Sequence, residues 1–386
     1  MNSRERVNTT LNHKEPDKVP LDLGGHQSGI HVKAYRKLLN FLDIKENNIR
    51  YCDFIQQIAL PCEELLERFK IDIRYVRPLG GMVQINEFQP QYEGNYVGIY
   101  DQFGCFWGND ANKDLDNILY YDPVIHPLSD LNSVQEIENY DWPNGRDKTP
   151  FKGLKQYAKK LRETTDYAIS TPPTGCIYEY TTFLFGFTKA LRYLRTKPEL
   201  IVAAMEGLLE YWIDYNVTFL NEVGEFLDVI CINGDLAEQA GPIMNLKIYE
   251  QVIKPVEKKL SEKIHELADV KINYHSCGST PLFIPHWVDI GYDIYNPVQI
   301  SAYDMEPCSL KKRFGNKITF WGGMCNTQAT LPFGTPEEIR LEVKRNIECF
   351  KPGGGYVAAN IHNITAEVPP QNIVAMFDAA NEFRKY

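Results

Sequence analysis

The sharpest chemical signal in the sequence is a histidine and a cysteine two positions apart, His275 and Cys277, where the apolar run VKINYHS (270–276) ends. On an extended strand end, an imidazole and a thiolate at this spacing can both reach one ion. Zinc favours such ligands, and a catalytic zinc keeps three protein ligands and one open position. Two further donors, Cys325 and His362, also follow apolar runs. All four are candidate metal ligands; a small buried Cys325 and a hydrogen-bonded structural His362 are the ordinary alternatives.

Two acidic residues are candidate catalytic groups. Asp235 directly follows Asn233-Gly234 at the end of another apolar run, where it could act as a base, a metal ligand or a partner for a cation. The alternative is an N-cap of the element that follows. Glu179 lies between Tyr178 and Tyr180, and an aromatic setting can raise the pKa of a carboxyl group so that it acts as an acid. A solvated Glu179 at a helix start is the alternative.

Four residues are candidate substrate contacts. His26 lies in a glycine-rich loop, and Asn233 stands beside the candidate base. Tyr178 and Trp107 could line a pocket for an aromatic ether or a quaternary ammonium group. The glycine runs lack the context of a phosphate-binding loop and no G-x-S-x-G motif is present, so nucleotide binding and a serine triad are not expected.

Strand-like apolar runs alternate with helical patterns and must position these residues. Such alternation predicts a parallel sheet covered on both faces, and eight strand–helix units predict a (β/α)₈ TIM barrel with its site at the carboxyl ends of the strands. An open doubly wound sheet is the alternative. The eight runs cover residues 19–24, 71–76, 167–173, 228–234, 270–276, 293–298, 317–322 and 356–362.

Two of the helices have readable ends. Thr335 is predicted to cap a helix that begins at Pro336, with Glu338 closing a capping box, and KPGGG ends that helix. A second amphipathic run follows Pro370 and contains Ile373, Phe377 and Ala380.

Residues 79–125 interrupt the strand–helix rhythm. They contain Gly80-Gly81 and the alternating stretch YVGIYDQFGCFW, which predicts an antiparallel β excursion near the barrel mouth. Residues 1–386 are therefore expected to form a single barrel domain that carries this excursion.

Composition narrows the class of protein. The chain has 386 residues, 44% hydrophobic and 24% charged, and a net charge of −10, which does not favour nucleic acid as a partner. No apolar run is long enough for a membrane span and the N-terminus has no signal-peptide core, so a cytoplasmic location is expected. Nine cysteines without paired spacing are then expected to be free thiols.

Several segments along the whole chain resemble the uroporphyrinogen decarboxylase superfamily. They are the opening MNSRERVNTTLNHKEPDKVPLDLG, the GPI stretch after Asp235, the His-x-Cys-Gly strand end, TQATLPFGTPEE and the final HNITAEVPPQNIVAMF. The resemblance implies a (β/α)₈ barrel. Decarboxylases of this family carry an arginine-rich loop, roughly MRQAGR, that binds propionates, whereas this chain reads GGHQSGIH there. That difference favours the other branch, the cobalamin-dependent methyltransferases, which include coenzyme M enzymes and demethylases of methoxy compounds.

In the methyltransferases of the coenzyme M type, zinc is bound through His-x-Cys and a later cysteine. His275 and Cys277 match the first pair, but the later position falls near His362. The resemblance thus leaves either His362 or Cys325 as the third ligand.

The resemblance implies a methyl group moving between a small methylated donor or acceptor (a methoxy compound, a methylamine-like compound or a thiol) and cobalamin on a separate corrinoid protein, with Zn²⁺ assisting. Two alternatives stay open. One is a uroporphyrinogen decarboxylase-like carboxy-lyase in which Asp235 stabilises a cationic intermediate, and the other is a non-catalytic corrinoid- or metal-binding module. No membrane partner is expected, and a homodimer is left open.

Overall fold

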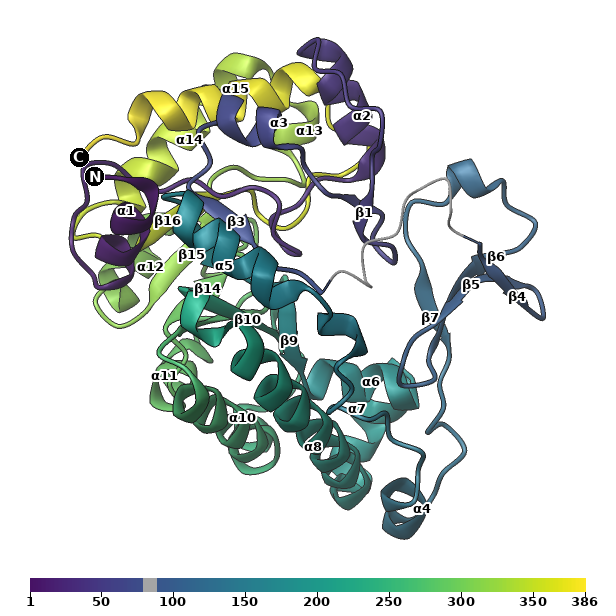
Figure 1. The fold of residues 1–386 in the computed structure, drawn as a ribbon. Helices are drawn as coiled ribbons and strands as arrows, with labels where there is room; N and C mark the ends of the chain where they lie inside the picture. Colours follow the sequence, from purple (N-terminus) through teal and green to yellow (C-terminus); the bar gives the residue numbers. More distant parts are fainter. Residues whose placement is uncertain (79–88) are drawn as a thin grey trace.

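Parallel strands form the centre of the computed structural model, which describes residues 1–78 and 89–386 (Figure 1). Six of them pair side by side in one sheet. In spatial order they are β9 (Pro173–Cys176), β10 (Val229–Asn233), β13 (Lys271–His275), β14 (Ile294–Asn296), β15 (Thr319–Gly323) and β16 (Tyr356–Ala359). A further parallel pair joins β3 (Ile73–Tyr75) to β8 (Ala168–Ser170).

Backbone hydrogen bonds close these strands into a barrel. Leu21, in the predicted first strand, forms a parallel bridge to Ala358 of β16, and its carbonyl accepts from the amide of Asp72 at 2.9 Å. On the other side, the amide of Asp228 donates to the carbonyl of Ile169 in β8 at 2.9 Å. Seven of the eight predicted runs contain a barrel strand, and the first, residues 19–24, takes part through the single bridge at Leu21. The ring of hydrogen bonds excludes the open sheet.

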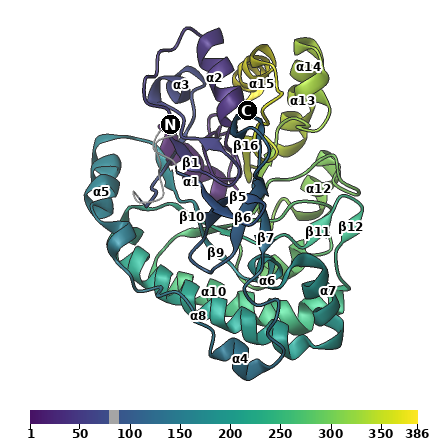
Figure 2. The same ribbon diagram turned by 90° about the vertical axis from the view of Figure 1, so that its right-hand side faces the viewer.

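Helices surround the barrel, and their ends follow from the sequence (Figure 2). The predicted capping box is present: Thr335 Oγ1 accepts from the amide of Glu338 at 3.3 Å, and Glu338 accepts from the amide of Thr335 at 2.7 Å. The helix runs over Pro336–Phe350 (α14). The predicted C-terminal helix is α15 (Pro370–Phe383), and its Ile373, Phe377 and Ala380 are buried.

The remaining elements are mostly short. The other helices are α1 (Ser3–Leu11), α2 (Val32–Phe41), α3 (Glu63–Arg68), α4 (Val134–Glu138), α5 (Leu154–Thr164), α6 (Tyr178–Phe185), α7 (Phe187–Thr196), α8 (Pro198–Val223), α9 (Leu246–Ile248), α10 (Lys254–Leu267), α11 (Ile284–Asp289), α12 (Pro307–Phe314) and α13 (Thr330–Phe333). Two small hairpins are β1 (Tyr51–Asp53) with β2 (Ile58–Ala59), and β11 (Ala237–Glu238) with β12 (Gly241–Pro242).

The predicted excursion is a four-stranded antiparallel sheet. It contains β4 (Gln91–Glu93), β5 (Tyr96–Tyr100), β6 (Phe106–Asp110) and β7 (Asp122–Ile125). It stands beside the barrel in Figure 1 and in front of the barrel strands in Figure 2, so it lies over one end of the barrel. The side chain of Asp101 joins it to α6, because it accepts hydrogen bonds from Trp107 Nε1 and from the hydroxyl of Tyr180. Residues 79–88, which include Gly80-Gly81, lie outside the described residues.

One expectation about the cysteines was wrong. Cys308 at the start of α12 and Cys349 near the end of α14 form a disulfide, and the other seven cysteines are free. The two residues are 41 positions apart in the sequence, and only the packing of the two helices brings them together. Spacing along the chain therefore could not reveal this pair.

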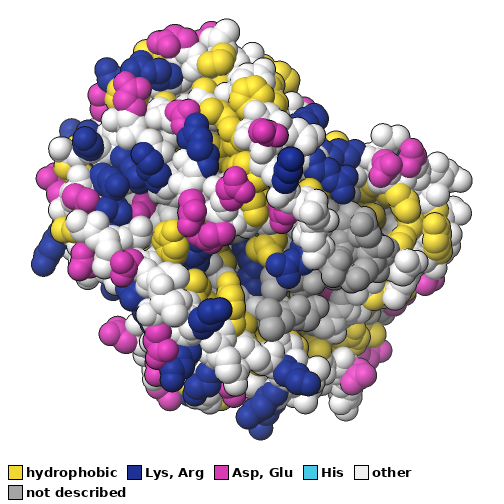
Figure 3. Space-filling view, turned by 45° about the horizontal axis from the view of Figure 1, so that its top comes forward, with side chains coloured by type: hydrophobic (Ala, Val, Ile, Leu, Met, Phe, Trp, Pro, Cys, Tyr) yellow, Lys and Arg dark blue, Asp and Glu magenta, His cyan; other side chains and the backbone are white. Residues whose placement is uncertain are grey.

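The outer surface shows no segregation of charge on the face drawn in Figure 3, where Lys and Arg alternate with Asp and Glu. The net charge of −10 is thus not gathered into one patch on that face. Among the described residues, no helix combines the length and the apolar character that crossing a membrane requires.

A buried ionic cluster holds the chain termini against the second barrel strand. Asp72 accepts from Arg6 at 2.6 Å, from Arg384 at 3.1 Å and from the amide of Leu21 at 2.9 Å. The two arginine side chains are 5% and 2% exposed. A charge removed from water to this degree needs its partner, because an unpaired buried charge is strongly unfavourable.

We therefore expect Asp72→Ala to lower the free energy of unfolding by about 3–5 kcal/mol, since it leaves two buried guanidinium groups without their shared carboxylate. Urea unfolding followed by circular dichroism measures this change. The matched control is Arg68→Ala, which removes the exposed pair with Asp378 and should cost at most about 1 kcal/mol. Equal losses in the two variants would contradict the structural role given to Asp72.

Candidate active site

Polar residues from four neighbouring strands form one row at the carboxyl end of the barrel. Cys176 of β9 lies opposite Asn233 of β10, which lies opposite His275 of β13, which lies opposite Asn296 of β14. Because the strands are parallel, their carboxyl ends meet at one edge and bring these side chains together. The candidate residues Asp235, Cys277 and Glu179 follow these strand ends directly.

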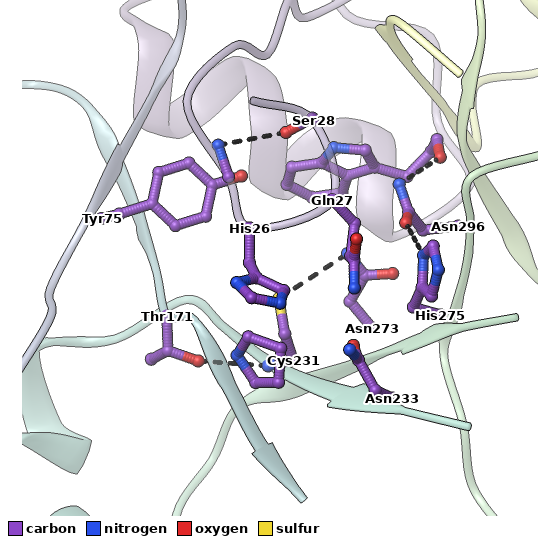
Figure 4. Close-up of a pocket in the computed structure, with 13 residues that line it drawn as sticks. His26, Gln27, Ser28, Tyr75, Thr171, Cys231, Asn233, Asn273, His275 and Asn296 are labelled. Carbon is purple, nitrogen blue, oxygen red and sulfur yellow. Dashed lines mark hydrogen bonds between the residues drawn. The ribbon is translucent and has the colours of Figure 1, made fainter. Parts of the chain in front are cut away.

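A small cavity of about 20 Å³ lies on the barrel side of this row (Figure 4). Such a volume has room for water but not for a larger molecule. His26, Asn233 and His275 line it, together with Asn273 and Trp321. The side-chain oxygens of Asn233 and Asn273 are buried there without a hydrogen-bond partner among the described residues. The cavity therefore offers acceptors to any molecule that enters it.

Three of the four predicted metal ligands come together. The potential ligand atoms of His275, Cys277 and His362 all lie within 4.8 Å of one another, and His275 Nε2 is 3.5 Å from Cys277 Sγ. Cys325 is not part of this group. It is fully buried, and its sulfur lies 3.9 Å from a carboxylate oxygen of Glu342 on α14.

The ring of His275 is held in the orientation that a metal ligand needs. The amide nitrogen of Asn296 donates to the carbonyl of Trp321 at 2.9 Å, so the Asn296 oxygen faces His275. His275 Nδ1 then donates to that oxygen at 2.6 Å, as Figure 4 shows, and Nε2 keeps its lone pair toward Cys277. Burial lowers the pKa of His275 to about 4, so the ring is neutral at physiological pH. This is the outer hydrogen bond that ligating histidines commonly make.

His362 is held differently. Its residue has a positive φ of 58°, and its Nδ1 accepts from the amide of Asn363 at 2.8 Å. The neutral ring therefore carries its proton on Nε2, and it must release or relocate that proton before Nε2 can bind an ion. Burial and the neighbouring His275 lower the pKa of His362 to about 3. Of the two histidines, His275 is the one already prepared to bind.

Asp235 fixes the position of Cys277. Its Oδ1 accepts from the amide of Cys277 at 2.7 Å and lies 3.8 Å from His275 Nε2. Asp235 thus caps the turn after β13. Burial, with Asp235 and Glu179 adding to it, raises the pKa of the Cys277 thiol well above its usual range. Without a cation the thiol keeps its proton, and a bound cation would displace it.

Glu179 and Asp235 form a pair of neighbouring acids. Glu179 lies in the first turn of α6, and Cys176 Sγ donates to it at 3.3 Å. Burial and then the charge of Asp235 raise the pKa of Glu179 to about 8. Burial also raises the pKa of Asp235. Because two carboxylates that act on each other resist double ionisation, the pair retains a proton at neutral pH.

The predicted substrate contacts lie in different places. His26 lines the small cavity and is held by Asp53, 3.1 Å from its Nδ1, while Asn233 lines the same cavity. Tyr178 is fully buried and is not among the cavity residues. Trp107 is in β6, where it donates to Asp101 and packs edge-on against Phe183. The structure thus brings two of the four to the cavity, whereas the other two are buried elsewhere and do not line it.

Arg77 is a residue that sequence reasoning missed. It follows β3, is only 4% exposed and donates to the carbonyl of Gly24 in the loop before His26. Its Nε and Nη1 have no hydrogen-bond partner among the described residues. The missing arginine in residues 24–31 therefore does not leave this loop without a cation. The signal for it in the sequence is its position directly after the strand-like run 71–76, at the end of the barrel where the site lies.

A family model and several curated proteins match this chain, and they point to the same family. A family model described as "Uroporphyrinogen decarboxylase (URO-D)" matches residues 121–383, more than half of the chain. A uroporphyrinogen decarboxylase from Pseudoalteromonas translucida is 38% identical over 73 residues, 19% of this chain and 20% of that protein. One from Psychromonas ingrahamii is 24% identical over 204 residues, 51% of this chain and 52% of that protein. The chain thus spans between about a fifth and about half of these curated relatives.

Methyltransferases are also among the similar proteins. The methylcobamide:CoM methyltransferase MtbA of Methanosarcina mazei is 23% identical over 267 residues, 68% of this chain and 71% of that protein. A solved structure of a methyltransferase from Methanosarcina mazei superposes with a TM-score of 0.67 over 99% of both chains, at 18% identity. At that identity the superposition establishes the barrel fold.

The raised pKa of Glu179 leads to a prediction about how the free energy of unfolding depends on pH. Between the ordinary value of 4.5 and about 8, the unfolded chain has lost this proton and the folded chain retains it. Glu179 therefore lowers the free energy of unfolding as pH rises through this window, by at most about 1.4 kcal/mol per pH unit. We expect metal-free Glu179→Gln to gain stability relative to the unsubstituted protein from pH 5 to pH 8. Urea unfolding at each pH measures the difference, with Glu163→Gln on the exposed face of α5 as the control. If the free energies of unfolding of Glu179→Gln and the unsubstituted protein differ by the same amount at every pH, that result would contradict the raised pKa of Glu179.

Proposed function

The chain belongs to the uroporphyrinogen decarboxylase family, and within it we propose that it is a zinc-assisted, corrinoid-dependent methyltransferase. It would move a methyl group between a small methylated substrate and the cobalt of a separate corrinoid protein. The observation that carries the proposal is the convergence of His275, Cys277 and His362 within 4.8 Å at the barrel mouth. The likeness to MtbA over two thirds of the chain supports it.

The residues present fit a zinc ion. Two imidazole nitrogens and one thiol sulfur are the donor set that zinc prefers, and three protein ligands leave one position for a substrate atom. His275 presents a free lone pair, because Asn296 holds its other nitrogen. Cys277 is held by the bond from its amide to Asp235. When bound, zinc would act as a Lewis acid toward the sulfur, oxygen or nitrogen that gains or loses the methyl group. Cys325 lies against Glu342 and would not take part.

The two acids supply the proton chemistry. Glu179 holds a proton up to a pH of about 8, and it can therefore protonate an oxygen or nitrogen as a methyl group leaves that atom. Asp235 raises the pKa of Glu179 through its charge and fixes the backbone of Cys277. In the opposite direction of transfer, the same pair would accept the proton of a substrate thiol.

The partner follows from the proposed reaction. Cobalamin carried by a corrinoid protein would supply the cobalt that accepts or delivers the methyl group. His26 and Asn233, which line the small cavity beside the ligand group, would contact the substrate. Tyr178 and Trp107 are buried and do not line that cavity, so neither is assigned a contact with the substrate.

A second candidate function rests on Arg77. A carboxy-lyase of the decarboxylase branch needs a cation for substrate carboxylates, and Arg77 is buried beside the loop of His26 with two nitrogens unpaired among the described residues. Asp235 would then stabilise a cationic intermediate. A non-catalytic module that binds a metal or a corrinoid would show the same ligand group but no turnover.

The metal assignment is tested by substitution. We expect about one zinc per chain in the unsubstituted protein, and loss of it in His275→Ala and Cys277→Ser. His362→Ala should weaken binding less than His275→Ala, because His362 must first give up its Nε2 proton. Asn296→Ala should weaken binding about 10–100-fold through the orientation of His275. Cys325→Ser should keep its zinc. Metal analysis after dialysis measures all five, and loss in Cys325→Ser with retention in His362→Ala would contradict the ligand set.

The reaction is tested with a panel of methyl donors and acceptors. We expect methylation of cob(I)alamin from a methoxyarene or a methylamine, or transfer from methylcobalamin to a thiol, with a loss of at least about 100-fold in Cys277→Ser. Cys62→Ser, a free cysteine outside the ligand group, should keep full activity. Loss of carboxylate from uroporphyrinogen, without methyl transfer in either direction, would establish the decarboxylase instead. Metal binding without any turnover would establish the non-catalytic module.

A further inference from the structure

A second cavity, of about 210 Å³, shares His362 with the ligand group. It lies between the chain around β2, the segment before β7 and the turn after β16. Its apolar wall consists of Ile58, Leu119, Tyr120 and Ile364. Ile58 and Ile364 are buried, whereas Leu119 and Tyr120 are 46% and 45% exposed. The cavity is therefore closed on the barrel side and reached from solvent on the side of the excursion.

The volume and lining suit one ring-sized apolar molecule. An apolar cavity of about 150 Å³ is sufficient to bind benzene, so this one holds a benzene ring with a short substituent. Tyr120 offers an aromatic face to such a ring. The small cavity beside His26, by contrast, has only about 20 Å³.

His31 places one unpaired donor in this apolar wall. It is 5% exposed, and its Nδ1 accepts from the amide of Lys33 at 3.1 Å as the N-cap of α2. Burial lowers the pKa of His31 to about 4, so the ring is neutral and its proton lies on Nε2. The backbone carbonyl of Leu119 lies near enough to the ring to act as a weak hydrogen-bond partner, which raises that pKa. This contact does not meet hydrogen-bond geometry, so Nε2 has no well-aligned acceptor among the described residues. A buried N–H without an acceptor is unfavourable, and a ligand that brings one would remove that cost.

Charged groups of both signs lie around the cavity. Among the described residues that line it, none is Lys or Arg, and Glu367 is exposed at its edge. Two lysines lie just behind the lining: the ammonium of Lys37 donates to the carbonyl of Ala366 at 3.1 Å, and Lys33 and Lys37 both act to lower the pKa of His31. The charges near the cavity therefore have both signs, and they do not determine the charge of the ligand. Arg77, the buried guanidinium with unpaired nitrogens, is not among the lining residues.

We propose that this cavity is the substrate subsite, and that it binds a ring-sized, mainly apolar molecule whose single hydrogen-bond acceptor faces His31 while its reacting group faces His362. The inference rests on the proposed function for its catalytic meaning, since His362 belongs to the candidate zinc group. His31 acts as a residue that selects substrates, and Tyr120 and Leu119 act as the walls of the entrance.

Two probes of the same shape test the role of His31. Acetophenone carries a carbonyl acceptor, and α-methylstyrene replaces that oxygen with a CH₂ group; neither is a methyl donor. We expect the protein to bind acetophenone about tenfold more tightly, which corresponds to about 1.4 kcal/mol for one hydrogen bond. His31→Asn keeps an N-cap acceptor for α2 but removes the Nε2 donor. This substitution should abolish the preference for acetophenone while leaving the affinity for α-methylstyrene unchanged. Titration calorimetry or ligand-observed NMR measures both affinities.

A second pair of variants tests the place of binding. Ala366→Leu fills the cavity and should weaken both probes at least tenfold. Ala203→Leu, in the groove along α8 away from the ligand group, should leave both affinities unchanged. Thermal melting of each variant confirms that it is folded. Equal affinities for the two probes, or probe binding that survives Ala366→Leu, would overturn the proposal.

The outcome separates this inference from the proposed function, because probe binding is measured with and without zinc and needs no turnover. If probe binding depends on His31 but the protein transfers no methyl group, the cavity is supported as a binding site and the proposed methyltransferase function is contradicted. If the protein transfers methyl groups and acetophenone does not inhibit this activity, the methyltransferase function is supported and the cavity is not its substrate subsite.

Discussion

The register of the parallel strands is the constraint on which the candidate site depends. Cys176, Asn233, His275 and Asn296 lie opposite one another across β9, β10, β13 and β14. A slip of one residue between any two strands would turn one side chain of the row to the other face of the sheet. His275 would then lose Asn296, and Cys277 would lose the carboxylate of Asp235. The buried Asp72 cluster, which ties both ends of the chain to the second strand, stabilises the ring in which this register is fixed.

Burial sets the charge state of the site before any ligand binds. It raises the pKa values of Glu179, Asp235 and Cys277 and lowers those of His275 and His362, so each group favours its neutral form. A site of this kind avoids the cost of ionised groups away from water. A divalent cation would reverse the balance at the thiol, since its charge compensates the thiolate. Metal binding and proton release are therefore linked in the proposed mechanism.

A buried acid below the site supports the turn that carries Asp235. Glu257 of α10 lies between the hydroxyls of Tyr249 and Tyr274, at 2.9 and 2.8 Å, and Tyr274 also reaches the carbonyl of Gly234 at 3.0 Å. Burial raises the pKa of Glu257 to about 7. When protonated, Glu257 can donate to Tyr274, which then donates to Gly234, and every group in this chain is paired. The backbone next to Asp235 is thus held from the helix layer outside the barrel.

The sequence by itself determined seven of the barrel strands, the capped helix after Thr335, the antiparallel excursion and the pairing of His275 with Cys277. These features depend on local periodicity, on cap residues and on spacing within one strand end, and all three can be read directly from the order of the residues. The tertiary structure alone decided that His362 and not Cys325 joins this pair, that Arg77 and His31 have buried unpaired donors, and that Cys308 meets Cys349. Each of these depends on which distant segments pack together and on where a side chain points. Sequence spacing does not encode either, because barrel closure joins residues hundreds of positions apart.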